Sequence, residues 1–390
     1  MKELQAERPR VYEGLDGVVV SETLLSHVDG ESGFLVVAGH DIEELASEYT
    51  FEEAARLLFR AAGDDSSVES VQAGLQSGRE QAFLRLSTLG DALDQVDAMD
   101  ALRAATGHLS ERATREQIIG ALAVFTAAHC RRRAGLSPIE PPARAGHAEA
   151  LLTMLGVRVD RARVRALDSY LVTVMEHGFN ASAFAARVVA STRSDLVSAV
   201  VAGIGALKGP LHGGAPGPVL ELLETIATSD RIQVCLEQEL AAGRRIMGMG
   251  HRIYRQRDPR AFVLERALEQ LSAASSGRSQ PSGAGASTPT ELADDARLRA
   301  RLTLARQVEQ VAEALLEARH PGRNLRANVE FYTAVLLSAL DLPGASFAAV
   351  FACARSAGWV AHVAEQRTRG KLIRPRANYI GALPVRAVSA

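Results

Sequence analysis

Helix start signals recur along this chain from residue 50 onward, and they constrain its fold more than any other feature. Thr50 and Glu53 form a capping box in front of the run FEEAARLLFRA, which predicts a helix there. Asn180 can cap the run AFAARVVAST, and Asp258 with Pro259 can start the run DPRAFVLERALEQL. Further helices are expected over residues 291–318 and from about Val329 and Ser346. The sequence therefore predicts an all-α fold.

The first fifty residues have a different pattern. Short apolar runs rich in Val and Leu lie on both sides of the turn sequence DGESG, residues 29–33. Such runs around a glycine-containing turn are typical of a β-hairpin. We therefore expect one small N-terminal β-hairpin. Far from it, residues 273–290 are rich in Gly, Ser and Pro, which predicts an exposed flexible loop.

Length and charge limit the class of protein. A chain of 390 residues can bury a large core and form two or more structural units. The net charge of −2 and the short basic clusters argue against nucleic-acid binding. The most apolar runs, near 196–207 and 334–340, are shorter than a membrane span, and the charged start does not resemble a secretory signal. No membrane partner is expected.

The cysteines point to a reducing compartment. Cys130, Cys235 and Cys353 are isolated and odd in number, and no CxxC or metal-ligand spacing is present. We expect reduced thiols in a cytoplasmic protein and no metal site.

Three histidines lie beside glycine at boundaries between expected elements. They are His177 in EHGFNAS, His212 in GPLHGGAPGP and His251 in MGMGHRIYR. Glycine lets a backbone or ligand approach closely, and element boundaries often line pockets. His212 alone leaves two interpretations open, an incidental histidine in a helix–loop–helix connection or a pocket residue. The other seven histidines, such as His362, are interpreted as ordinary, for example helix-face, residues.

Arginines and one glutamate accompany these histidines. Arg260 follows His251, and Arg355 lies in the apolar run FAAVFACARSAGWV, where a guanidinium needs an anionic partner. That partner could be a buried carboxylate of the protein or a bound substrate carboxylate. Glu330 in RANVEFYTAV is either a favourable helix N-terminal charge or a base. Arginines, a carboxylate and histidine donors together suit proton abstraction next to a carbonyl.

These motifs, in their order and spacing, resemble the citrate synthase family of the shorter bacterial and archaeal type. The resemblance covers nearly the whole chain and includes HGFNASAFAARVVAST, GALKGPLHGGAPGPV, MGMGHRIYRQRDPRA, NVEFY, CARSAGWVAHVAEQ and IRPRANYIG. It implies an all-helical homodimer that condenses acetyl-CoA with oxaloacetate in the tricarboxylic acid cycle. It also implies a large domain, residues 1–213 and 342–390, and a mobile small domain, residues 214–341.

The resemblance assigns a role to each motif residue. His212 would donate to the thioester oxygen, Glu330 would remove the methyl proton, and His251 would polarise the oxaloacetate carbonyl. The oxaloacetate ligands would be His177, Arg260, Arg355 and, from the partner subunit, Arg374. The CoA phosphates would contact Arg255 and Arg323. No cofactor is expected, since acetyl-CoA is a substrate.

Three departures from the family pattern affect the functional hypothesis. Glu330 replaces the usual aspartate, and its extra methylene could move the carboxylate by about 1 Å, a misplacement that can cost on the order of 100-fold in rate. Gly178 stands where many relatives have glutamate, and Pro216 and Gly217 where an Asn-Glu pair is common.

Because the motifs agree over nearly the whole chain, citrate synthase is the first hypothesis. The alternatives are a 2-methylcitrate synthase that uses propionyl-CoA and a catalytically weak ligand-binding homologue.

Overall fold

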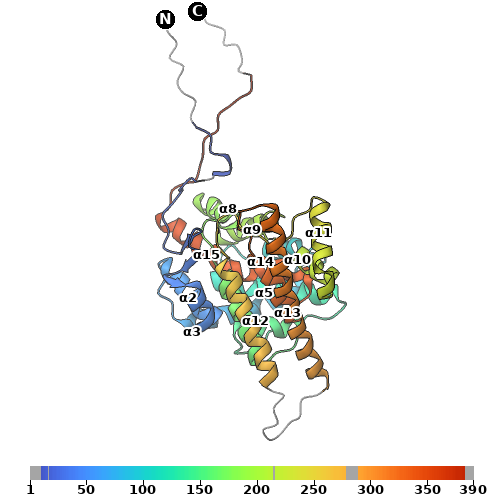
Figure 1. Cartoon of the computed structure of the whole chain (residues 1–390). Coiled ribbons are helices and arrows are strands. Elements are labelled where there is room, and N and C mark those ends of the chain that lie inside the picture. Colours follow the sequence, from blue (N-terminus) through green and yellow to red (C-terminus); the bar gives the residue numbers. More distant parts are fainter. Residues whose placement is uncertain (1–9, 16, 214–215, 278–288, 383–390) are drawn as a thin grey trace, which may run out of the picture.

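The computed structural model of the chain describes residues 10–15, 17–213, 216–277 and 289–382. Within these ranges it has fifteen α-helices, four 3-10 turns and one three-stranded sheet, so the predicted all-α fold is confirmed (Figure 1). The helices are α1 Ile42–Glu48, α2 Phe51–Ala61, α3 Val68–Arg85, α4 Ala98–Thr106, α5 Arg115–Arg133, α6 His147–Leu155, α7 Arg161–Val174, α8 Ala181–Ser191, α9 Leu196–Leu207, α10 Pro216–Ile226, α11 Ile232–Ala241, α12 Pro259–Gly277, α13 Pro289–Arg319, α14 Val329–Ala339 and α15 Phe347–Arg369.

The predicted N-terminal hairpin is confirmed. Strands β1 Ser26–Asp29 and β2 Phe34–Val37 pair antiparallel, with Asp29 opposite Phe34. The side chain of Asp29 accepts hydrogen bonds from the backbone N–H groups of Glu31 and Ser32, at 3.0 and 3.1 Å, which closes the turn. A third strand, β3 His40–Asp41, pairs with β2 and was not predicted, because two residues are too short to give a pattern.

The predicted helix starts are also found. Thr50 and Glu53 form the reciprocal capping box at the start of α2. Asn180 accepts from the N–H of Ala183 at 3.0 Å, and Asp258 accepts from the N–H of Arg260 at 3.0 Å. These caps satisfy N–H groups that the first helical turn leaves unpaired.

The loop predicted over residues 273–290 is wrong at both ends. Helix α12 continues to Gly277, and α13 begins at Pro289. Ala273 and Ala274 favour helix, and proline suits the first helical position, so local propensity outweighs the low-complexity composition there. Residues 278–288 lie outside the described residues. Figure 1 shows α12 and α13 running together away from the body of the protein toward this segment.

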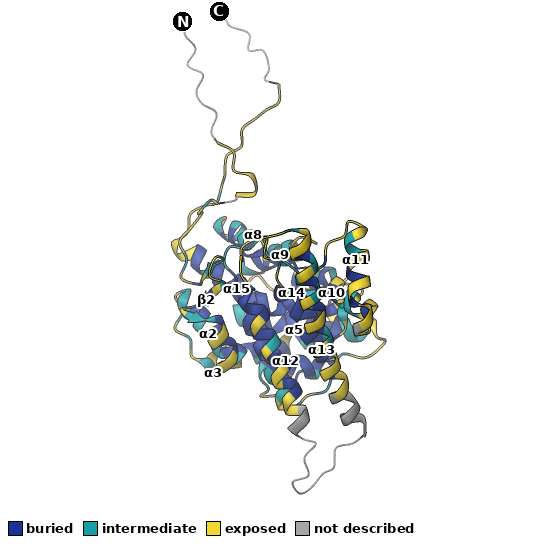
Figure 2. Cartoon of the chain, in the orientation of Figure 1, coloured by how far each residue is buried: buried dark blue, intermediate teal, exposed yellow. Residues whose placement is uncertain are grey.

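Helix α15 forms the centre of the core. It packs against α5, α7, α8 and α9, and Figure 2 shows it as a buried helix among its neighbours. Residues 344–369 form a helix long and apolar enough to cross a membrane, but 89% of its apolar 18-residue window is buried inside the protein. A Cβ added at Gly203 of α9 would lie 2.9 Å from the ring of Trp359, so these helices pack closely. The segment is therefore a core helix.

Helix α12, from the predicted small domain, packs against α7 and α1 of the predicted large domain. Helix α14 packs against both α12 and α10. These contacts bring the ends of α7, α12 and α14 to one region of the molecule, where the predicted site residues lie. The division into domains itself stays a prediction.

Asp168 on α7 and Glu52 on α2 form a buried acidic pair that should make stability depend on pH. Burial, with the Glu52 charge, raises the pKa of Asp168 to about 7. Between about pH 4 and 7, the folded chain therefore keeps a proton on Asp168 that the unfolded chain has already released. The free energy of unfolding should fall as pH rises through this window, by up to about 4 kcal/mol from this group.

Asp168→Asn should remove that loss. The asparagine oxygen can still accept the N–H of Phe51, which Asp168 accepts at 3.1 Å. The variant should be more stable than the parent at pH 8 by about 2–4 kcal/mol and nearly equal to it at pH 4, measured by urea unfolding. Asp65→Asn, at a side chain that is 92% exposed, is the matched control. The same stability difference at both pH values would show that Asp168 is not protonated in the folded chain.

Candidate active site

Six predicted site residues come together between α7, α12, α14 and α15. The rings of His177 and His251 lie 5.7 Å apart, centroid to centroid, and a guanidinium nitrogen of Arg260 lies 3.4 Å from Nε2 of His251. Arg260 and Arg355 are both close enough to lower the pKa of His177. The other two members of the group are His212, which is close enough to Arg355 to feel its charge, and Glu330, which is close enough to Arg260 to feel its charge.

The loop that carries His251 is fixed by backbone pairing. Met249 forms a β-bridge with Ala327, and Gly250 has φ of +79°, which favours glycine. Nδ1 of His251 accepts the N–H groups of Ile253 and Tyr254, at 3.1 and 3.2 Å. The neutral ring therefore carries its hydrogen on Nε2, the nitrogen that faces Arg260. Burial, with the Arg260 charge, lowers the pKa of His251 to about 4, so the ring is neutral at pH 7.

His212 has the opposite tautomer. Its Nε2 accepts the backbone N–H of Ser182 at 3.3 Å and lies 2.9 Å from the Ser182 hydroxyl oxygen. The hydrogen of the neutral ring is therefore on Nδ1. Burial, followed by the Arg355 charge, lowers the pKa of His212 to about 4. Trp359 donates its indole N–H to the same Ser182 hydroxyl at 3.0 Å, which holds the serine against α15.

Arg260 is held by a buried ion pair. Asp258 binds it through both carboxylate oxygens, at 3.0 Å to Nε and 2.8 Å to Nη2. Asp258 also accepts the N–H of Val329 at 3.1 Å, so the same carboxylate ties the start of α12 to the start of α14. This arrangement fixes Glu330, the second residue of α14, relative to Arg260.

Glu330 presents a carboxylate suited to proton transfer. Its backbone N–H donates to the capping side chain of Asn328 at 3.0 Å, while its carboxylate makes no hydrogen bond within the described part of the chain. Burial raises the pKa of Glu330 to about 7, although the Arg260 charge opposes this. A carboxylate with a pKa near 7 is half ionised at neutral pH, and it is a strong enough base to remove a proton from a carbon atom next to a carbonyl.

Arg355 lies inside α15 with only 1% of its surface exposed. Its Nε donates to the carbonyl oxygen of Val174 at 2.7 Å, and no described carboxylate forms an ion pair with it. Burial lowers its pKa to about 10, so it stays charged at neutral pH. Glu176 is close enough to act on Arg355 by charge but forms no ion pair with it, so the guanidinium can still pair with a bound anion, and its role as an oxaloacetate ligand stays a prediction.

His177 and Gly178 shape the other wall of the site. Nε2 of His177 lies 3.0 Å from the hydroxyl of Tyr254, and burial with nearby Arg260 keeps the pKa of His177 well below its usual range. Gly178 has φ of +62°, a left-handed conformation that explains why glycine is suited to this position. Pro216 and Gly217, the other departure, are the first two residues of α10.

Three predicted ligands lie outside this group in the single chain. Arg374 is exposed in the segment after α15, which Figure 1 shows leaving the body of the protein. Arg255 is exposed near the hairpin turn, with its Nε 4.0 Å from Glu31, and Arg323 is exposed between α13 and α14. Their assignments to a partner's site and to CoA phosphates stay predictions.

Several residues that hold the site together were not predicted from the sequence as site residues. They are Ser182, Tyr254, Trp359 and, beyond its role as a helix cap, Asp258. Asp258 and Ser182 gave a signal only as residues that can start a helix. A hydroxyl or indole in a helical run has no feature that separates a site role from a packing role.

The chain is similar to known proteins over nearly its full length. Residues 14–376 match the family model described as citrate synthase, C-terminal domain. A citrate synthase of Mycolicibacterium smegmatis is 33% identical over 97% of both chains. A 2-methylcitrate synthase of Mycobacterium tuberculosis is 34% identical over 96% of this chain and 92% of its own. The crystal structure of citrate synthase from Thermotoga maritima superposes with a TM-score of 0.78 and 32% identity, over 97% of this chain and 98% of that one.

Proposed function

Since this chain belongs to the citrate synthase family, and is therefore an acyltransferase, we propose that its site condenses acetyl-CoA with oxaloacetate and water to give citrate and free CoA. One arrangement carries this proposal. Two neutral imidazoles with opposite tautomers, His212 and His251, belong to the same group of residues as Glu330, a carboxylate without a hydrogen-bond partner among the described residues. Free thiol released from acetyl-CoA, only when oxaloacetate is present, tests it.

The first step is removal of a proton from the acetyl methyl group. Glu330 accepts that proton, and the electron pair moves toward the thioester oxygen. Nδ1–H of His212 donates a hydrogen bond to this oxygen and stabilises the enol-like species as charge develops. A neutral imidazole serves here because its N–H is a donor that keeps its hydrogen at pH 7.

In the second step the new nucleophilic carbon attacks the carbonyl carbon of oxaloacetate. Nε2–H of His251 gives its proton to the carbonyl oxygen, which becomes the hydroxyl of the product, and the imidazole regains a proton from solvent as Glu330 releases the methyl proton to solvent. Water then attacks the citryl thioester, the carbon–sulfur bond breaks, and CoA and citrate leave. Closure of the small domain, residues 214–341, over the large domain would exclude water until the new carbon–carbon bond has formed.

The substrate carboxylates are matched to the cationic groups of the site. Arg260, Arg355 and His177 would bind oxaloacetate, with Arg374 supplied by the other subunit of a homodimer. Arg255 and Arg323 would contact the phosphates of CoA. The proposed reaction needs no cofactor beyond its substrates. A cytoplasmic location is also proposed, and the three unpaired cysteines are compatible with it.

Propionyl-CoA is the alternative acyl donor. The similarity to the 2-methylcitrate synthase, 34%, is close to the similarity to the citrate synthase, 33%. One methylene in an apolar pocket changes discrimination by only about 10–200-fold, so both acyl-CoAs should be measured. The hypothesis of a catalytically weak homologue is less favoured, because Glu330 keeps a carboxylate with the pKa of a working base.

The raised pKa of Glu330 predicts the pH profile. Only the ionised carboxylate can accept a proton, so kcat/KM for oxaloacetate should rise about tenfold per pH unit below about pH 7 and level off above it. The pKa values of His212 and His251, about 4, place their titration below this range. Initial rates from pH 5.5 to 8.5 at constant ionic strength provide the measurement. A flat profile over this range would exclude Glu330 as a base with that pKa.

A further inference from the structure

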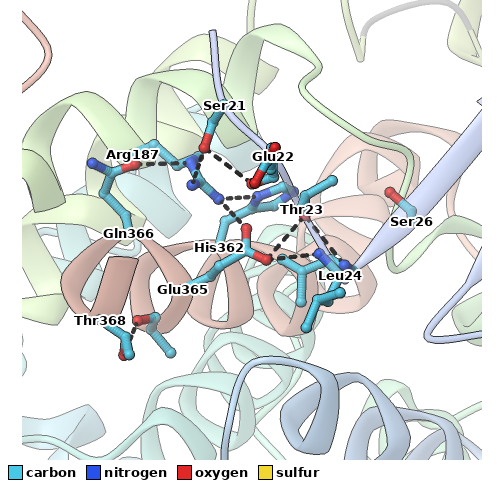
Figure 3. Close-up of polar contacts among 12 residues, drawn as sticks. Ser21, Glu22, Thr23, Leu24, Ser26, Arg187, His362, Glu365, Gln366 and Thr368 are labelled. Carbon is cyan, nitrogen blue, oxygen red and sulfur yellow. Dashed lines mark hydrogen bonds and ion pairs between the residues drawn. The ribbon is translucent and has the colours of Figure 1, made fainter. Parts of the chain in front are cut away.

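A buried polar cluster lies behind the site, centred on Arg187 of α8 (Figure 3). The Arg187 cluster consists of Arg187, His362, Glu365 and Gln366, all less than 5% exposed. Arg187 donates to Glu365 at 2.7 Å, to Nδ1 of His362 at 3.0 Å and to the side-chain oxygen of Gln366 at 3.1 Å. Its guanidinium also lies 4.5 Å from the ring centroid of Phe179. These three partners are on α15, and Arg187 also donates to the hydroxyl of Ser21, at 3.5 Å, in the N-terminal segment.

The cluster holds the N-terminal segment through Glu365. One oxygen of Glu365 binds Arg187, and the other accepts the backbone N–H of Leu24 at 2.8 Å and the hydroxyl of Thr23 at 3.2 Å. Figure 3 shows this segment running past the side chains of α15. The residues just before β1 are therefore fixed to the buried ion pair.

The cluster reaches the site through His362. The earlier interpretation of His362 as an ordinary helix-face residue is wrong, because it is fully buried and bonded on both ring nitrogens. Arg187 donates to Nδ1, so Nε2–H donates to Glu176, at 3.1 Å. The same oxygen of Glu176 accepts the N–H of Gly178 at 2.7 Å. These two hydrogen bonds fix the positions of Glu176 and Gly178, the residues on either side of His177.

Glu176 is anionic. Burial would raise its pKa, but the neighbouring His362 and Arg355, with the hydrogen bond from Ser26, outweigh burial and lower it. Its second oxygen is buried and has no hydrogen-bond partner in the described part of the chain, and the Glu176 charge favours the charged form of Arg355. Glu176 thus affects two proposed oxaloacetate ligands. It fixes the backbone next to His177, its neighbour in the chain, and its charge acts on Arg355.

The cluster also holds the segment that carries Arg374. The side-chain N–H of Gln366 donates to the carbonyl oxygen of Lys371 at 2.9 Å, and the backbone N–H of Ile373 donates to the Ser191 hydroxyl at 3.1 Å. Lys371 precedes Arg374 by three residues. Beyond this anchor the segment is exposed.

We propose that the Arg187 cluster is a positioning hub for the oxaloacetate-binding groups of two active sites. It holds His177 and Glu176 in its own chain, and it fixes the starting point of the segment that carries Arg374 to the partner subunit. A buried ion pair adds little net stability, so stability alone accounts poorly for it. This inference rests on the proposed function, because the ligands that the hub positions are those of oxaloacetate.

The contact between the Arg187 cluster and the segment that carries Arg374 is tested by Gln366→Met. This change keeps the length of the side chain and removes its hydrogen bonds. Oxaloacetate should bind about tenfold more weakly by calorimetry, with kcat within about twofold of the parent. Amide hydrogen exchange in residues 370–374 should become faster. Thr368→Val is the matched control, since Thr368 is an exposed residue of α15 whose hydroxyl donates to the carbonyl oxygen of Ala364 in the same helix. It should leave affinity, kcat and exchange unchanged.

The contact between the Arg187 cluster and the backbone next to His177 is tested by a pair of variants at His362. His362→Leu removes both ring bonds and should weaken oxaloacetate binding about tenfold. His362→Gln can accept from Arg187 and donate to Glu176, so it should restore affinity to within about threefold of the parent. Circular dichroism of each variant checks that it is folded.

The outcomes separate the hub from the function. A parent chain that binds no oxaloacetate and releases no CoA overturns the proposed function and the hub with it. A parent that is active, together with a folded Gln366→Met variant of unchanged affinity and exchange, overturns the hub alone. The hub is also overturned if His362→Leu and His362→Gln lose affinity equally. If His362→Leu does not fold, the Gln366→Met result decides.

Discussion

Replacing Glu330 with glutamine should lower kcat for CoA release by about 1,000-fold, while the affinity for oxaloacetate changes less than about threefold. Glutamine keeps the shape of the side chain but cannot accept the methyl proton. Oxaloacetate binding depends on the cationic groups, and Asp258 rather than Glu330 neutralises Arg260 in the folded chain. The loss should therefore appear in turnover and not in binding. Stopped assays of thiol release and calorimetry with oxaloacetate measure the two quantities.

Two further variants make the result specific. Glu330→Asp keeps a carboxylate and should stay active, although the shorter side chain changes its reach by about 1 Å. Glu69→Gln, at an exposed position of α3, makes the same chemical change far from the site and should have no effect. Near-normal CoA release by Glu330→Gln would mean that another group takes the proton.

Arg355→Ala and Arg374→Ala should each abolish most activity alone and recover part of it when mixed. Arg355 is buried in the site of its own chain, whereas Arg374 is exposed and lies outside that site. If Arg374 acts in the partner's site, a dimer of the two variants has one complete site and one that lacks both arginines. Random exchange between equal amounts should restore roughly a quarter of the parent activity.

Subunit exchange must be shown independently. Two different affinity tags allow the mixed dimers to be isolated and counted, and mixing Arg355→Ala chains that carry different tags is the control that should give no recovery. Isolated mixed dimers without activity would contradict the shared site. The position of Arg374 in the exposed segment after α15 would then need another explanation.

The fold could be predicted from local chemistry wherever that chemistry is strong. Capping side chains such as Thr50, Asn180 and Asp258 act within one helical turn, so a single sequence shows them. Strand β3 was missed because its two residues depend on pairing with β2. The ends of α12 and α13 were missed because composition and helix propensity disagree around residues 273–290.

The site was only partly predictable. His177, His212, His251, Arg355 and Glu330 stand out in sequence because each is a polar residue in a glycine-rich or apolar stretch, and Arg260 stands out as one of several arginines that follow His251. The groups that fix their tautomers and positions do not stand out. Ser182 and Tyr254 act through hydrogen bonds to residues 30 and 77 positions away, and such pairs form only when the helices pack. His362 was misjudged for the same reason, since its partners lie on α8 and before α8.

The most direct test of the proposed function is thiol release measured with purified protein and each acyl-CoA in turn. With acetyl-CoA and oxaloacetate, we expect CoA release with citrate as the product, no release when oxaloacetate is omitted, and a lower kcat/KM with propionyl-CoA. A higher kcat/KM with propionyl-CoA would instead identify a 2-methylcitrate synthase. No oxaloacetate-dependent release from either thioester would contradict the proposed function.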